Sequence, residues 1–164
     1  MNILKKIVHI LSLICYVFII FYAILCAPII FKYKPLVVLT GSMEPKFKTG
    51  SIIYYKEVSE DKLKVGDIIT FKLGDNLVSH RIYSIENGLY ETKGDANNTV
   101  DANKIKYSDI VGKDADICIP YVGFYVKYIN EHMFILIIVA AILVSEFLLS
   151  NIGNNERGKE KLNE

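Results

Sequence analysis

The sequence predicts a mostly β fold, in which a small antiparallel β domain is flanked by an N-terminal and a C-terminal transmembrane helix. Three observations support this fold class: an apolar block near each end of the chain, and short runs of β-branched and aromatic residues between them. The 164 residues allow one ordinary domain plus appendages, and 52% of them are hydrophobic. The net charge of +1 gives no reason to expect a nucleic-acid partner.

The first apolar block runs from Ile7 to Phe31 and contains no Asp, Glu, Lys or Arg. A helix needs about 20 apolar residues to cross a bilayer, so the block is long enough with some tilt. A cleaved signal peptide is the alternative interpretation. The block exceeds a typical signal-peptide core and no small-x-small site closes it, which favours an uncleaved transmembrane helix over 7–31.

The second apolar block, from Met133 to Ser150, is just long enough to cross a membrane. An interfacial or hairpin helix is the alternative to a transmembrane helix over 133–150. Glu146 is the one acidic residue of the block and lies near its C-terminal end. Its carboxylate is expected to reach the interface, although a functional group inside the membrane is the other interpretation.

Two lysines, Lys5 and Lys6, precede the first block, and positively charged flanks favour the cytoplasmic side. We therefore expect a multi-pass protein of the cell membrane with a cytoplasmic N-terminus, 1–6, and a cytoplasmic tail, 151–164. The domain between the helices, 32–132, is then extracytoplasmic.

The middle domain contains five short runs typical of strands, separated by turn signals. They are 35–40, 50–58, 66–73, 77–85 and 89–94. The "ENG" between the last two predicts a hairpin turn, and "SEDKLKVGD" favours one helical turn. One or two further strands are expected in 109–129, whose last part, "CIPYVGFYVKYI", is either a core strand or a segment that dips into the membrane interface.

Cysteine usage gives this domain no covalent support. Cys118 is its one cysteine, because Cys15 and Cys26 lie in the first apolar block. One cysteine forms no internal disulfide, and no metal-ligand spacing is present, so neither a metal nor another cofactor is expected.

Four polar residues stand at predicted strand ends and turns, and their types fit a serine hydrolase: Ser42, His80, Asp95 and Asp101. A serine nucleophile needs a base, and the base needs a carboxylate that fixes its tautomer. His80 is the one good candidate for the base, because the next histidine, His132, abuts the second apolar block. Residue types alone leave a membrane-tethered binding domain as an open alternative.

Four motifs in order, "GSMEP", "GDIITF", "SHRI" and "KGDAN", closely resemble the type I signal peptidases. The similarity is to the endoplasmic-reticulum-type branch, which also occurs in archaea and some spore-forming bacteria, and it covers roughly Val37 to Gly123. The resemblance implies a membrane-bound serine endopeptidase that removes signal peptides from secreted preproteins.

The resemblance also implies roles for the four polar residues. Ser42 matches the nucleophile, and His80 occupies the position where the other bacterial branch has a lysine base. Asp101 aligns best with the carboxylate that pairs with the histidine, and Asp95 matches a more supportive position, although a shift of one residue would exchange them. A Ser–Lys dyad is the rival mechanism, with Lys93, Lys46 and Lys48 as the nearest lysines in the sequence.

Substrate contacts are expected around the nucleophile. The backbone N–H of Ser42 is the expected oxyanion donor, and Gly41, Met43 and Val38 are expected to border the substrate. The strand 35–40 is a candidate edge strand to which an extended substrate could add. Signal-peptide-bearing preproteins and the lipid bilayer are the expected partners, with the secretion translocon as a further candidate.

Two alternatives to a general signal peptidase stay open. One is a non-enzymatic, membrane-tethered β module that binds a partner. The other is a peptidase specialised for a few secreted substrates.

Overall fold

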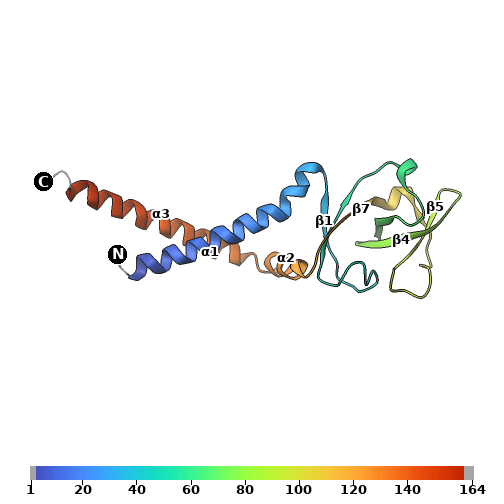
Figure 1. The fold of residues 1–164 in the computed structure, drawn as a ribbon, viewed down its shortest axis with the longest axis horizontal. Helices are drawn as coiled ribbons and strands as arrows, with labels where there is room; N and C mark the ends of the chain where they lie inside the picture. The colour runs from blue at the N-terminus through green and yellow to red at the C-terminus, as the bar shows by residue number, and fades with distance from the viewer. Residues whose placement is uncertain (1–2, 161–164) are drawn as a thin grey trace. The chain divides into compact units, whose positions relative to one another are not determined.

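The computed structural model describes residues 3–160, with side chains described as far as Asn151. This part of the chain forms two compact units. One contains the two long terminal helices, and the other runs from Cys26 to Tyr128 and contains the β-sheet. Figure 1 shows the elements of both units along the chain.

The two long helices are apolar enough to cross a membrane. Helix α1 (Ile3–Cys26) continues into the 3-10 helix η1 (Ala27–Phe31), and together they form a candidate span, Ile3–Phe31. Helix α3 (Phe134–Glu160) contains the second candidate span, Phe134–Asn151. It extends beyond the apolar block into the predicted tail, of which 161–164 lie outside the described residues. Nδ1 of His9 and Oε1 of Glu146 lie 2.9 Å apart, so the Glu146 carboxylate contacts α1.

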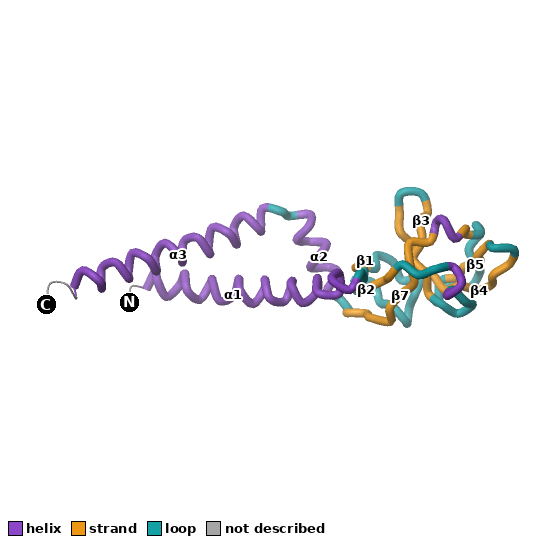
Figure 2. The backbone as a smooth tube through the Cα atoms, turned by 90° about the horizontal axis from the view of Figure 1, so that it is seen from above, coloured by secondary structure: helices purple, strands orange, loops and turns teal. Residues whose placement is uncertain are grey.

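The β unit is built on a single seven-stranded antiparallel sheet, in the order β1-β2-β7-β3-β4-β5-β6. Figures 1 and 2 show strands of this unit. The strands are β1 (Lys34–Val37), β2 (Ile52–Lys56), β3 (Ile68–Leu73), β4 (Asn76–Glu86), β5 (Leu89–Lys93), β6 (Ile105–Lys106) and β7 (Ile110–Ile119). Strand β7 pairs with both β2 and β3 and therefore joins the two halves of the sheet. The predicted small antiparallel β domain is confirmed.

Two clusters of buried side chains hold the sheet together. The first gathers apolar residues of β3, β4, β5 and β6 and one residue of the loop before β3, namely Leu63, Ile69, Phe71, Ile82, Tyr90 and Ile105. The second attaches the loop after β1 to the sheet through Met43, Phe47, Ile53 and Ile68. Burial of each large side chain contributes about 1.5–3 kcal/mol, so the second cluster fixes a loop that lacks regular secondary structure.

The predicted hairpin joins β4 to β5 through Asn87 and Gly88. Both residues have positive φ, 52° and 73°, which is the conformation that an Asn-Gly hairpin turn requires. The predicted helical turn is also present, as the 3-10 helix η2 (Glu60–Lys62).

The segment before the second candidate span is not a core strand throughout. Strand β7 ends at Ile119, and helix α2 (Val122–Glu131) follows instead of a longer strand. That this segment dips into the membrane interface stays a prediction. Gly123 lies at the start of this helix, where a Cβ would meet the carbonyl oxygen of Gly50 at 2.8 Å. The absence of a side chain there lets α2 begin directly against the loop that precedes β2.

Candidate active site

Ser42 lies in the loop that connects β1 to β2. The loop is turned back on itself by hydrogen bonds from the Glu44 N–H to the Gly41 carbonyl, 3.0 Å, and from the Phe47 N–H to the Met43 carbonyl, 3.0 Å. Met43 and Phe47 are 3% and 1% exposed, so their side chains anchor the loop in the core. A short hydroxyl side chain is thereby held in place by buried neighbours.

Three predicted residues meet at this loop. Oγ of Ser42 lies 3.0 Å from Nε2 of His80, and Nδ1 of the same ring lies 2.6 Å from Oδ2 of Asp101. His80 is located on β4, where it is 8% exposed, and its ring meets the edge of Phe71 on β3. A buried imidazole between a hydroxyl and a carboxylate is the arrangement that activates a serine in Ser-His-Asp hydrolases.

The Asp101 carboxylate is itself held by β5. Oδ2 accepts a hydrogen bond of 2.6 Å from the Thr92 hydroxyl, and the Asp101 N–H donates to the Thr92 carbonyl at 2.8 Å. Thr92 is fully buried. Sequence reasoning missed this residue, because a threonine in a strand is ordinary and its partner is set by the fold.

Asp95 has a different partner from Asp101. Its two carboxylate oxygens accept hydrogen bonds from Nε and Nη2 of Arg81, at 2.8 and 2.7 Å, which is the bidentate geometry of strong arginine–carboxylate pairs. Hydrogen bonding to Asp95 raises the pKa of Arg81 above its ordinary value. The structure brings Asp101, and not Asp95, to the His80 ring.

The turn that carries Asp95 supports the Ser42 loop through the backbone. The Ala96 N–H donates to the Ser42 carbonyl at 2.9 Å, and a Cβ on Gly94 would meet the same oxygen at 2.6 Å. The Ser42 N–H has no acceptor within residues 3–160. The carbonyl of the serine is therefore fixed, while its N–H is available to another group.

The predicted substrate contacts have distinct environments. Gly41 is partly exposed next to Ser42, whereas the Met43 side chain is buried, so only the backbone of Met43 could meet a substrate. The Val38 N–H donates to the Ser51 carbonyl, and the Val38 carbonyl accepts from the Gly50 N–H, both at 2.8 Å. These bonds face β2.

Strand β1 is the edge of the sheet beyond which no strand of residues 3–160 pairs. Backbone groups alternate between the two sides of a strand, so those of Val37 and Leu39 face the open edge while those of Val38 face inward. Pro35 also faces outward, where its missing N–H breaks no bond of the sheet.

The three lysines of the rival dyad have other surroundings. Lys46 Nζ contacts Asp116 at 2.7 Å, and Lys48 Nζ lies 3.5 Å from the Tyr121 hydroxyl. Lys93 pairs in register with Arg81, on the face of β5 opposite to Thr92. Of the candidate bases, the imidazole is the one within hydrogen-bonding distance of the Ser42 hydroxyl, which also lies 3.4 Å from the Thr40 hydroxyl.

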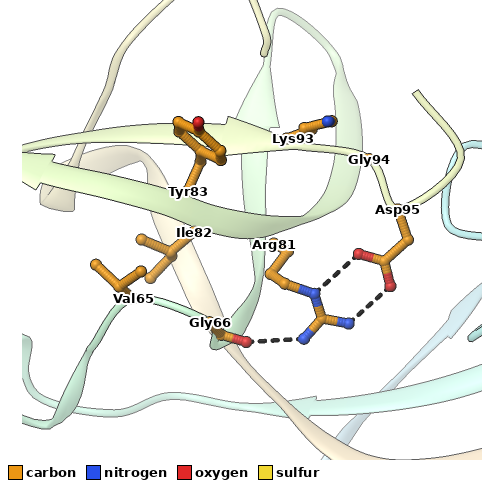
Figure 3. Close-up of a pocket in the computed structure, with 8 residues that line it drawn as sticks. All are labelled: Val65, Gly66, Arg81, Ile82, Tyr83, Lys93, Gly94 and Asp95. Carbon is orange, nitrogen blue, oxygen red and sulfur yellow. Dashed lines mark hydrogen bonds and ion pairs between the residues drawn. The ribbon is translucent and has the colours of Figure 1, made fainter. Parts of the chain in front are cut away.

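A cavity of about 420 Å³ borders the Asp95 turn on the far face of β4 and β5 (Figure 3). Figure 3 shows the Arg81 guanidinium inside it, bonded to Asp95 and to the Gly66 carbonyl. Side chains alternate along a strand, so Arg81 and Lys93 lie on the face of the sheet opposite to His80 and Thr92. The cavity therefore lies behind the Asp95 turn and does not contain the Ser42 hydroxyl.

A second carboxylate pair, not predicted from the sequence, lies on β7. Burial raises the pKa of Asp114 to about 6, and its Oδ2 has no partner within residues 3–160. Its Oδ1 accepts from the Asp116 N–H at 2.8 Å, and hydrogen bonding to Lys46 lowers the pKa of Asp116. Lys46 links this pair to the Ser42 loop.

Comparison with known proteins identifies similar sequences. Residues 9–107 match the family described as signal peptidase, peptidase S26. The chain is 40% identical over 103 residues to signal peptidase I W of Bacillus subtilis, covering 59% of this chain and 50% of that protein. It is 34% identical over 111 residues to the human signal peptidase complex catalytic subunit SEC11C, covering 58% and 57%.

A longer match is to the signal peptidase complex catalytic subunit SEC11 of Lodderomyces elongisporus. The two are 33% identical over 130 residues, which cover 70% of this chain and 76% of the relative. The matched region spans only about half the length of the bacterial relative and of the human one.

Proposed function

The chain belongs to the signal peptidase family, peptidase S26, in its endoplasmic-reticulum-type branch, and from this premise we propose that it cleaves signal peptides from preproteins as a serine endopeptidase. The observation that carries the proposal is the hydrogen-bonded series Ser42–His80–Asp101, with distances of 3.0 and 2.6 Å. Neither a binding module nor a structural anchor requires this series.

The proposed reaction begins with proton transfer. Nε2 of His80 accepts the hydroxyl proton of Ser42 as Oγ attacks the scissile carbonyl, and the ring then donates that proton to the leaving amine. Asp101 accepts from the Nδ1–H of His80, which keeps Nε2 unprotonated before attack and stabilises the imidazolium afterwards. Water then hydrolyses the acyl-enzyme with the same base.

The tetrahedral intermediate needs a donor for its oxyanion. The Ser42 N–H is suited to this role, since the Ser42 carbonyl is engaged by Ala96 and the N–H is not. Loss of one such donor typically costs about 10²–10³ in rate. Gly41, next to it, has no side chain to obstruct an approaching peptide backbone.

The substrate is proposed to bind as an extended strand along the open edge of β1. Main-chain hydrogen bonds would come from Val37 and Leu39, and Leu39 is 62% exposed. The family resemblance implies small residues one and three places before the cut. A segment next to Gly41 in this register would bring its carbonyl to Ser42.

The membrane helices support a site near the bilayer surface. About ten residues separate Phe31, the end of the first candidate span, from Ser42, and they reach at most about 35 Å when extended. We propose a multi-pass protein of the cell membrane with a cytoplasmic N-terminus and an extracytoplasmic catalytic domain. Preproteins emerging from the secretion translocon would then reach Ser42 at this surface.

The test is cleavage of a preprotein with a small-x-small site by the purified full chain in liposomes. Wild type is expected to cut at that site and Ser42→Ala is not, while Ser108→Ala, a change at an exposed serine, retains activity. Cleavage by Ser42→Ala at the same site would refute Ser42 as the nucleophile. A panel of several preproteins separates a general peptidase from one specialised for a few substrates.

A non-enzymatic tethered module makes the opposite prediction. It would bind a preprotein without cutting it, and binding would be unaffected by Ser42→Ala. The polar series at Ser42 favours the enzyme, because a binding module gains nothing from a buried histidine held between a hydroxyl and a carboxylate.

A further inference from the structure

A second cavity, of about 310 Å³, lies at the start of the sheet and away from the Ser42 loop. It is lined by Ile29, Lys32, Tyr33, Lys34, Lys56 and Glu57. These residues come from the end of η1, the first residues of β1 and the end of β2, which meet because Lys34 pairs with Tyr55 in the antiparallel register. Three lysines and one glutamate give the cavity a net charge of +2.

One lysine of the cavity is already neutralised. Lys34 Nζ lies 2.6 Å from Oε1 of Glu57, and this hydrogen bond raises the pKa of Lys34 and lowers that of Glu57. The positive charge of Lys56 lies 4.9 Å above the centre of the Tyr33 ring, which is within the range of a cation–π contact. The Lys32 side chain makes no hydrogen bond or close ion pair within residues 3–160, although its charge helps to lower the pKa of Glu57.

The backbone at Lys32 is fixed. This residue has a φ of 65°, and its N–H donates to the Ile29 carbonyl at 2.9 Å, while the Tyr33 N–H donates to the Pro28 carbonyl at 3.1 Å. The turn that ends the first candidate span is therefore well defined. The apolar span ends at Phe31, and the next residue, Lys32, already lines the basic cavity.

The cavity starts where the first candidate span ends. That span finishes at Phe31, and Ile30 and Phe31 are 81% and 67% exposed, next to the unpaired Lys32. Exposed apolar side chains directly before lysines are the pattern of a chain leaving the hydrocarbon core at the level of the headgroups. The ligand most concentrated at that level is a phospholipid headgroup.

We propose that this cavity binds the phosphate of an anionic phospholipid headgroup, held by Lys32 and Lys56, with the acyl chains beside Ile30 and Phe31. Lysine binds phosphate as a compact point charge, so a net charge of +2 favours a headgroup that bears a net negative charge over a zwitterionic one. Each lysine near an anionic surface favours association by about fivefold. The site adds a lipid specificity to the proposed peptidase and does not depend on its chemistry.

The chain offers a direct reporter for this site, because it contains no tryptophan. Tyr33→Trp places a single fluorophore in the cavity wall and preserves the cation–π contact with Lys56. The full chain is reconstituted in phosphatidylcholine vesicles that contain either phosphatidylglycerol or phosphatidylcholine with a spin label near the glycerol end of one acyl chain. Quenching of the tryptophan then measures which lipid lies beside the cavity.

The expected result is a preference for spin-labelled phosphatidylglycerol of roughly tenfold. The double variant Lys32→Gln/Lys56→Gln should bring the preference close to one. The matched double variant Lys72→Gln/Lys106→Gln removes two exposed lysines of β3 and β6 and should retain it. Equal quenching by the two lipids in the parent, or a preference that persists in Lys32→Gln/Lys56→Gln, would overturn the proposal.

Free phosphate is the other source of the same chemistry. Millimolar inorganic phosphate at constant ionic strength should leave the lipid preference unchanged, and abolition of the preference would reassign the site to a soluble phosphate. A second measurement uses chains without the Tyr33→Trp change. Phosphatidylglycerol retained per chain after detergent purification should fall in Lys32→Gln/Lys56→Gln and not in the matched variant, and equal retention would also overturn the proposal.

Discussion

His80 and Asp101 are joined by a hydrogen bond of 2.6 Å between Nδ1 and Oδ2. The same carboxylate oxygen accepts the buried Thr92 hydroxyl at 2.6 Å, so the carboxylate that orients the imidazole is itself oriented by the sheet. Asp95 lies six residues earlier and binds Arg81 instead. The two aspartates therefore support the Ser42 loop in different ways, one through the histidine and the other through the 94–97 turn.

The first prediction separates these aspartates. Asp101→Asn should lower kcat by about 10⁴-fold, as the equivalent change does in the Ser-His-Asp template, because an amide no longer fixes the tautomer. Asp95→Asn should cost less than about tenfold, since Asp95 does not contact the His80 ring and the side-chain oxygen of an asparagine can still accept a hydrogen bond from Arg81. Initial cleavage rates at equal protein concentration in liposomes test this, and the reverse order would reassign the carboxylate.

The second prediction concerns the base. His80→Lys should remain within about tenfold of His80→Ala, since an ammonium placed against the Asp101 carboxylate is held in its protonated form and accepts no proton from Ser42. The measurement is single-turnover cleavage between pH 7 and pH 10 for both variants. Near wild-type cleavage by His80→Lys at neutral pH would contradict this account of the site.

The third prediction tests the turn behind the nucleophile. Gly94→Ala puts a Cβ at 2.6 Å from the Ser42 carbonyl oxygen, so the loop must shift and activity should fall at least about tenfold. Gly112→Ala is the matched control, with a Cβ 2.6 Å from the Lys56 carbonyl oxygen and its nearest contacts on Lys56 and Tyr55 instead of the Ser42 loop. Both should lower Tm, but only Gly94→Ala should lose activity beyond its loss of folded protein. Equal specific activity would show that the loop tolerates the shift.

The fourth prediction follows from Asp114, whose pKa burial raises from 3.8 to about 6. Because the folded pKa lies above the unfolded one, the contribution to stability is complete below about pH 4 and is lost as pH rises through 6. The loss amounts to about 3 kcal/mol at about 1.4 kcal/mol per pKa unit. Asp114→Asn should therefore gain Tm over wild type as pH increases from 4.5 to 7, whereas Asp75→Asn at an exposed turn should not. A Tm difference that does not change with pH would contradict the prediction.

The sequence was sufficient for the parts of the fold that depend on local chemistry. The Asn87-Gly88 turn is defined by two residues that tolerate positive φ, and the strands on either side contain the β-branched and aromatic residues that pair in β4 and β5. The apolar helices are likewise defined by composition. Each of these elements can be predicted from the residues of its own segment.

Features that depend on distant partners were not predicted. Helix α2 contains several Tyr, Phe and Val residues that favour strands, and its start is held by a hydrogen bond from the Gly123 N–H to the Gly50 carbonyl, a contact across the chain. Strand β6 has only two residues and exists by pairing with β5. The hydrogen bond of Thr92 and the burial of Asp114 could not be predicted either, because both are set by the tertiary fold.

The candidate site falls between these cases. The four polar residues could be chosen from their types and motifs, and the structure brings Ser42, His80 and Asp101 into contact. The separation of Asp101 from Asp95 depends on the conformation of the 94–97 turn, which is held by the Ser42 carbonyl. The buried position of Met43 likewise follows from the tertiary core and not from its neighbours in the sequence.

Pro35 on the outer edge of β1 has a consequence for the solubility of the domain. An edge strand that stays unpaired to receive a guest peptide is also a template on which two copies of the domain could aggregate. Because Pro35 offers no donor, the uninterrupted row of outward backbone groups is short and begins only at Val37. A short row of backbone groups is enough to bind one extended peptide transiently, but it forms few hydrogen bonds between two sheets. Pro35 therefore reduces edge-to-edge aggregation of the domain.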